Sequence, residues 1–171
     1  MPGDKDLIVM KVTGLTMDPF TSMPIVILKD VEEKYALPIW IGLIEASAIA
    51  TELEKIKLSR PMTHDLIKNI MESAGVSVVK VIVSDLNDNT FYAQIYLKSE
   101  QKEWMCDARP SDAIALALRT QAPILVSKGV IEKTRRLDLT KEVLDKSAAK
   151  QQKWSEILEN LTPEDFGKYK M

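Results

Sequence analysis

The segment "PSDAIALALRTQAPILVS" (110–127) constrains the fold more than any other part of the chain. Pro110 suits a first helical position and Asp112 faces the positive end of a helix dipole, so we expect a helix to begin here. The stretch "AIALAL" is apolar around most of that helix, which indicates burial on several sides. "APILVS" then predicts a short apolar strand directly after it. This part of the chain is therefore expected to lie in the core.

Short strands are predicted on both sides of a central helical region. They are β-branched and separated by turn-prone or charged residues, and one pair is expected to join around Asn87–Asn89. Strands and helices alternate without regular βαβ repeats, which favours an α+β fold with a mixed, largely antiparallel sheet and packed helices. The predicted strand regions are "DLIVMKVTGL" (6–15), "MPIVILKD" (23–30), "YALPIWIG" (35–42) and 76–108, which holds two or three strands.

Two more helices are predicted between these strand regions. In "IEASAIATELEKI" (44–56) the apolar residues have helical spacing. In "RPMTHDLIKNIMESAG" (60–75) we expect Thr63 as the N-cap, Asp65 in the first turn and Gly75 at the C-terminal end. The apolar face of the first helix is expected to consist of Ile44, Ala48, Ile49, Leu53 and Ile56.

The composition changes character after about residue 135. A helical stripe and a second capped helix start predict a C-terminal helical extension over 136–171, following a main domain over 1–135. This extension is expected to pack on its own domain or a sister subunit, or to dock a different protein. The stripe contains Val143, Leu144, Ala148, Gln151, Trp154, Ile157, Leu158 and Leu161.

Composition excludes several classes of protein. The 171 residues include 46% apolar and 28% charged side chains, which is enough for one core without disulfides. Cys106 is the single cysteine, so an intramolecular disulfide and a multi-thiolate zinc site are excluded, and a reducing cytoplasm is expected. No apolar stretch approaches membrane-helix length, and the formal charge of -2 is not the basic balance of a protein that binds many phosphates.

Three segments occur together in an order that resembles the bifunctional nuclease (DUF151) family: 37–73, 81–98 and "DARPSDAIALALRTQAPILVS" (107–127). The resemblance spans roughly residues 5 to 135. It implies an α+β domain that assembles into homo-oligomers, and DNase and RNase activity reported for some plant members. The C-terminal extension lies outside the resembling region.

Polar residues near the predicted helix starts are the candidates for such an activity. Carboxylates can bind Mg²⁺ or Mn²⁺, and an arginine at a helix N-terminus can contact a phosphate. Asp107 and Asp112 are the candidate metal ligands, and no organic cofactor is expected. The candidate catalytic residues are Glu45, His64, Asp65, Asp107, Arg109 and Asp112.

Each candidate also has a purely structural interpretation. Asp65 and Asp112 fit compensation of a helix dipole, and Asp107 with Arg109 fits an ion pair that fixes a strand-to-helix turn. His64 fits an exposed or satisfied neighbour of a helix cap, and Glu45 fits a solvated acid in a first turn. Because His64 is the only histidine, a zinc site built on several imidazoles is excluded. The aromatic residues are expected in the core or a subunit interface rather than as a base-stacking platform: Trp40, Phe91, Tyr92, Trp104 and Trp154.

The sequence therefore leaves two candidate functions. The first is a nuclease that hydrolyses DNA and RNA phosphodiester bonds with a divalent metal, with single-stranded DNA or RNA as substrate. The second is a non-catalytic oligomeric module that binds a small anion or a protein partner. Convergence of three candidate residues in an open cleft would favour the enzyme, whereas mutual pairing under a subunit interface would favour the module.

Overall fold

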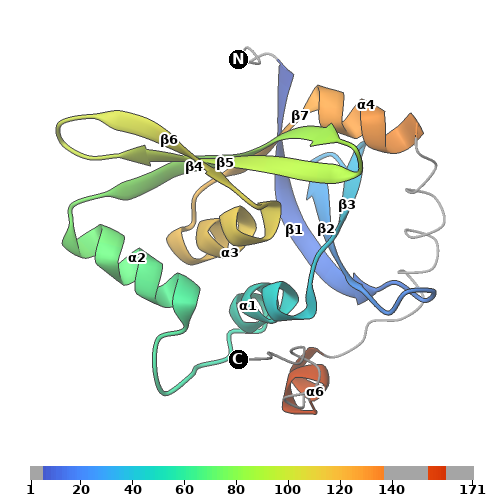
Figure 1. Cartoon of the computed structure of the whole chain (residues 1–171), viewed down its shortest axis with the longest axis horizontal. Coiled ribbons are helices and arrows are strands. Elements are labelled where there is room, and N and C mark those ends of the chain that lie inside the picture. The colour runs from blue at the N-terminus through green and yellow to red at the C-terminus, as the bar shows by residue number, and fades with distance from the viewer. Residues whose placement is uncertain (1–5, 137–153, 161–171) are drawn as a thin grey trace.

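The computed structural model describes residues 6–136 and 154–160 of the chain. Seven strands form one sheet, and helices pack against it, which confirms the predicted α+β class (Figure 1). The strands are β1 (Leu7–Met17), β2 (Pro24–Asp30), β3 (Ala36–Trp40), β4 (Ser77–Asn87), β5 (Thr90–Lys98), β6 (Glu103–Ala108) and β7 (Ile124–Ser127). The helices are α1 (Leu43–Leu53), α2 (Thr63–Ser73), α3 (Pro110–Thr120), α4 (Lys128–Arg136) and α6 (Trp154–Glu159).

The sheet is mixed and largely antiparallel, as predicted. Its strand order is β3-β2-β1-β7-β4-β5-β6, and β4 with β7 is the one parallel pair among these strands. β4 and β5 are joined by a tight turn in which Asp88 and Asn89 have positive φ angles of 47° and 60°. This confirms the turn predicted at Asn87–Asn89, because both residue types tolerate the left-handed conformation.

The core forms around α3, as its apolar sequence predicted. Residues 113–117 are all buried, and α3 packs against β4 and β5 on one side and against α1 and α2 on the other. Figure 1 shows α3 on one face of the β4–β5–β6 part of the sheet and α4 on the other. Three consecutive residues of β4, Val81 to Val83, are buried, as expected for a strand that is covered on both faces.

Some local features differ from the sequence-based expectations. The N-cap of α2 is Met62 rather than Thr63, and Asp65 accepts a hydrogen bond from the Met62 amide at 2.9 Å. The buried face of α1 is formed by Ala46, Ile49 and Ala50, while Ile44 is exposed. α4 was not predicted as a helix.

The core placement predicted for the aromatic residues is confirmed for two of the five. Trp154 of α6 is buried and its indole N–H donates to the Leu15 carbonyl, and Phe91 packs against the core. Tyr92 is exposed instead. The rest of the predicted C-terminal extension, apart from 154–160, lies outside the described residues, so the division at residue 135 stays a prediction. Within the described ranges, no helix is long and apolar enough to cross a membrane.

Candidate active site

Four of the six predicted residues meet where three helices begin. Glu45 lies in the first turn of α1, His64 in the first turn of α2, and Asp112 in the first turn of α3, where Arg109 is the N-cap. Arg109 is 64 residues from Glu45 in the chain, and Asp112 is 48 residues from His64. Hydrogen bonds nevertheless link all four side chains. We call Glu45, His64, Arg109 and Asp112 the helix-start cluster.

Arg109 is the centre of the helix-start cluster. Its Nε donates to Asp112 Oδ2 at 2.8 Å and its Nη1 donates to Glu45 Oε1 at 2.7 Å. The hydrogen bond and charge of Asp112, followed by those of Glu45, raise the pKa of the Arg109 guanidinium. The side chain is nevertheless 65% exposed, and Nη2 has no partner among the described residues. Nη2 is therefore open to an anion from solvent.

His64 lies on the opposite side of the Asp112 carboxylate. Its Nε2 is 3.0 Å from Asp112 Oδ1, and its side chain is 13% exposed. Burial raises the pKa of Asp112, but hydrogen bonds from Arg109 and His64 outweigh it, and the net pKa is below the usual value. An ionised carboxylate only accepts hydrogen bonds, so Nε2 is the donor. This leaves Nδ1 of a neutral His64 as a proton acceptor.

Gly42, the N-cap of α1, makes room for Glu45. A Cβ atom at this position would overlap the Glu45 carboxylate, which folds back over the start of the helix. A side chain at position 42 would therefore displace that carboxylate from its place beside Arg109. Gly42 could not be recognised from the sequence, since one glycine before a predicted helix is a common feature.

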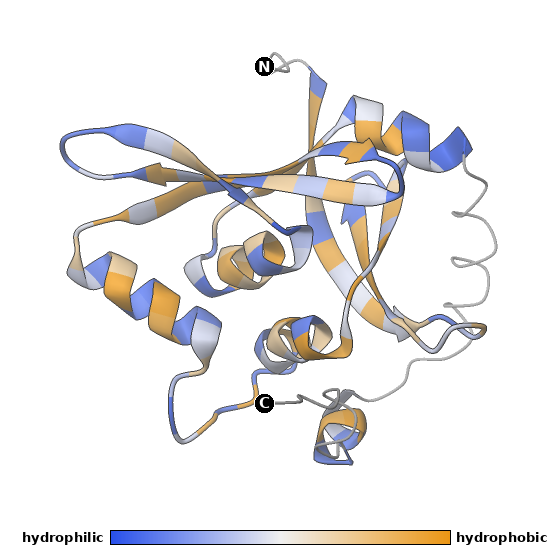
Figure 2. Cartoon of the chain, viewed as in Figure 1, coloured by the Kyte–Doolittle hydropathy of each residue, from blue (hydrophilic) through white to orange (hydrophobic). Residues whose placement is uncertain are grey.

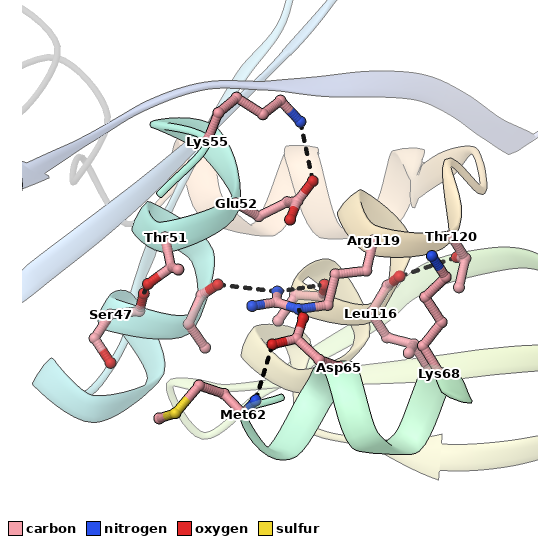
Figure 3. Close-up of polar contacts among 12 residues, drawn as sticks. Ser47, Thr51, Glu52, Lys55, Met62, Asp65, Lys68, Leu116, Arg119 and Thr120 are labelled. Carbon is pink, nitrogen blue, oxygen red and sulfur yellow. Dashed lines mark hydrogen bonds and ion pairs between the residues drawn. The ribbon is translucent and has the colours of Figure 1, made fainter. Parts of the chain in front are cut away.

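Asp65 is not part of the helix-start cluster. Its Oδ1 accepts from Arg119 Nε at 2.7 Å, while Arg119 Nη1 donates to the carbonyls of Ala48 and Ala115 at 2.9 Å each (Figure 3). The Arg119 side chain is only 3% exposed. Figure 3 shows the guanidinium between α1 and the first turn of α2. Arg119 thus joins α1, α2 and α3, and its position directly after the apolar run 113–118 was the sequence signal that could have identified it.

Asp107 also lies apart from the helix-start cluster. It pairs with Gln94 in the β5–β6 ladder, whereas the next residue, Ala108, pairs with buried Ala93 and packs against the core. Successive strand residues point to opposite faces, so the exposed Asp107 side chain lies on the face of the sheet opposite to α3. No hydrogen bond or ion pair between Asp107 and Arg109 is present in the described part of the chain.

The described residues do not form a ready-made metal cage. Within 6–136 and 154–160, no three or more His, Cys, Asp or Glu side chains are grouped as metal ligands would be. Both oxygens of Asp112 already accept hydrogen bonds, and Asp107 faces the other side of the sheet. The predicted pair of ligands, Asp107 and Asp112, therefore does not fit a resident metal in this arrangement.

Sequence comparisons identify relatives over most of the chain. A profile of the bifunctional nuclease domain matches residues 26–148. An uncharacterized protein of Mycobacterium tuberculosis is 34% identical over 161 residues, which cover 92% of this chain and 96% of that protein. Bifunctional nuclease 1 of Oryza sativa subsp. indica is 28% identical over 97 residues, and Bifunctional nuclease 2 of Arabidopsis thaliana is 28% identical over 95 residues. These matches cover 55% and 54% of this chain, and 29% of each plant protein.

Proposed function

The chain belongs to the bifunctional nuclease domain family, and we propose that it hydrolyses phosphodiester bonds of single-stranded DNA and RNA at the helix-start cluster. The observation that supports this most is the convergence of His64, Arg109 and Asp112 from three helix starts, with the Arg109 guanidinium 65% exposed. Family membership supports a nuclease, and the geometry supports the place where the chemistry occurs.

In this proposal Arg109 binds the scissile phosphate. Its Nη2 group offers N–H donors to phosphate oxygens, and its charge offsets the negative charge that develops during cleavage. Glu45 and Asp112 hold the guanidinium in a fixed orientation from two sides. The positive ends of the α2 and α3 dipoles add to the attraction of a phosphate at this place.

His64 is the proposed general base. Asp112 accepts a hydrogen bond from Nε2–H and thereby orients the ring, so Nδ1 is available to take a proton from the attacking water or ribose hydroxyl. A catalytic group of this kind typically contributes about 10²-fold to 10⁴-fold in rate. Asp112 therefore acts as a positioning residue for both His64 and Arg109.

We also propose that cleavage needs Mg²⁺ or Mn²⁺. Magnesium is commonly bound by one or two carboxylates together with substrate phosphates and water, so it does not require a complete protein cage. No catalytic step is assigned to the ion, because the described side chains form no group of three ligands. Asp107 remains a predicted metal ligand, although it lies apart from the helix-start cluster. Its contribution to cleavage is tested by its own substitution.

The alternative is a non-catalytic oligomeric module that binds a small anion or a protein partner. Mutual pairing favours it, since every carboxylate of the helix-start cluster is already bonded to Arg109 or His64. In both proposals the chain acts as a homo-oligomer. The single cysteine, which is exposed, agrees with a location in the reducing cytoplasm.

The test is cleavage of fluorescent single-stranded DNA and RNA in Mg²⁺, Mn²⁺ or EDTA. The His64→Ala/Arg109→Ala double variant is compared with Asp85→Ala/Lys133→Ala, which removes an exposed ion pair outside the cluster. The proposal expects metal-dependent cleavage that only the first variant loses. Equal cleavage by both variants would show a contaminant or a site elsewhere, and no cleavage by the wild type would favour the binding module.

A further inference from the structure

The helix-start cluster has a negative formal charge. Glu45 and Asp112 carry two negative charges and Arg109 carries one positive charge, so the sum is -1 when His64 is neutral. Asp65, the next residue in α2, is neutralised by its ion pair with α3. A nucleic acid carries a negative charge on every phosphate, and a site of negative charge repels the phosphates on either side of the one that Arg109 binds. A polymeric substrate therefore needs further cations beside the cluster.

The connection between α1 and α2, residues 54–62, carries such cations. Its charged residues are Glu54, Lys55, Lys57 and Arg60. Lys55 is bound to Glu52 at 2.9 Å, and Glu54 is the C-cap of α1, at the end of the connection that is distant from α2. Lys57 and Arg60 are exposed, and among the described residues neither has a hydrogen-bond or ion-pair partner. Two unpaired positive charges thus lie on the segment that leads into α2.

Arg60 is attached close to the helix-start cluster. It precedes His64 by four residues, so their Cα atoms are at most about 14 Å apart. The backbone between them is held in place, because the Met62 amide donates to Asp65 Oδ2 at 2.9 Å and Asp65 is itself bound to α3. Pro61 further restricts Arg60 to an extended conformation. The guanidinium is therefore near the cluster without being bound to any of its carboxylates.

We propose that Lys57 and Arg60 bind the phosphates that flank the scissile phosphate, so that a single strand crosses the α1–α2 connection on its way to the helix-start cluster. Arg60 binds the nearer phosphate and Lys57 a more distant one, since Lys57 lies three residues further from His64 in the chain. This inference rests on the proposed function and specifies its substrate. The substrate is a chain of several nucleotides rather than a mononucleotide or a dinucleotide.

Exposed apolar residues on the same connection favour unpaired nucleic acid. Leu58 and Met62 are 49% and 55% exposed, and they alternate with the two cations along the chain. Figure 2 shows hydrophilic and hydrophobic residues in alternation along this connection. The bases of a single strand offer apolar faces to such side chains, whereas a duplex keeps these faces stacked inside. A membrane surface fits less well, because lipid-binding segments typically carry clusters of about four to eight basic residues.

The test is the fluorescence anisotropy of a labelled single-stranded DNA of about 12 nucleotides, measured with the full chain in EDTA from roughly 50 to 200 mM salt. For single strands, each phosphate contact adds about 0.7 to the slope of log K against log salt concentration. Lys57→Ala/Arg60→Ala is therefore expected to lower the slope by about 1.4 and to weaken binding about 10-fold. Leu58→Ser should weaken binding without a change in slope, because it removes a contact to a base.

Lys11→Ala/Lys29→Ala is the matched control. It removes the same two charges, from lysines that are cross-strand neighbours on β1 and β2. Figure 1 shows these strands on the other side of α1 from the α1–α2 connection. The control should bind the DNA like the wild type, with the same slope. Circular dichroism and thermal unfolding check that each variant is folded.

Several results would overturn the inference: a wild type that binds no single-stranded DNA, a slope that stays the same without Lys57 and Arg60, or an equal fall in slope for the control. Tighter binding of a duplex of the same length, or binding of phosphatidylserine vesicles in place of DNA, would do so too. Because binding is measured without cleavage, failure here is distinguishable from failure of the nuclease proposal. Cleavage by a protein whose binding ignores both cations contradicts this inference alone, whereas binding that needs both cations in a protein that cleaves nothing contradicts the nuclease.

Discussion

The Arg109 guanidinium reaches from the start of α3 to the Glu45 carboxylate at the start of α1, with 2.7 Å between Nη1 and Oε1. This contact joins two helix starts that are 64 residues apart in the chain. It fixes one side of the guanidinium, while Asp112 fixes another. The Arg109 side chain is therefore held in a fixed orientation and is also exposed to solvent. A phosphate-binding arginine requires both properties.

Gly42→Ala is predicted to disturb this contact without removing a charge. The added Cβ would overlap the Glu45 carboxylate, whose flexible side chain then has to swing away from Arg109. Because the Arg109 side of the lost ion pair is 65% exposed, the free energy of unfolding should fall by less than about 1 kcal/mol. Cleavage should fall several-fold in the same protein. Urea unfolding and cleavage rates check both expectations, and a normal rate with a displaced Glu45 would remove Glu45 from the site.

Arg119→Ala is predicted to be far more destabilising than substitutions in the helix-start cluster. It leaves the Asp65 carboxylate without its ion pair and removes two hydrogen bonds to backbone carbonyls from a buried place. Losing one partner of a buried pair costs about 3 kcal/mol, and Asp65 is partly exposed, so a larger cost is not expected. Urea unfolding measures the loss. In an Asp65→Asn background the same substitution should cost less, and equal costs would mean that the pair is not coupled.

The stability contributed by Asp112 is predicted to disappear in acid. Its folded pKa is lowered below the usual 3.8, although burial alone would raise it, because Arg109 and His64 bond to the charged form. A lowered folded pKa adds stability above the unfolded pKa, and this stability is lost as the pH falls through the folded pKa. The difference in unfolding free energy between the wild type and Asp112→Asn should therefore shrink below about pH 4. A difference that stays constant from neutral pH to pH 3 would contradict this.

The sequence was informative about elements and less so about the faces that they present. The burial of α3, the turn at Asp88–Asn89 and the largely antiparallel sheet follow from local patterns, and the structure confirms them. α2 was predicted as a helix, but the pattern could not show that its charged side faces α3. That orientation depends on Arg119 and Asp112, which belong to another helix.

The candidate site shows the same limit. The sequence drew attention to Asp107 and Arg109 together because they are two residues apart. One ends a strand and the other begins a helix, so their directions depend on strand pairing, in which Ala108 and not Asp107 meets the core. Asp65 was selected for its place in the first turn of α2, yet its partner is the buried Arg119. Such partners are decided by tertiary packing and cannot be read from spacing.

The most direct measurement is the cleavage rate of one fluorescent single-stranded RNA by wild type, Arg109→Ala, Asp107→Asn and Lys133→Ala, all verified as folded. Removing the proposed phosphate ligand should lower the rate by about 10²-fold to 10³-fold, whereas Lys133→Ala should cleave like the wild type. Equal rates for Arg109→Ala and the wild type would contradict the account. If Asp107→Asn alone abolished cleavage, the chemistry would belong to the opposite face of the sheet.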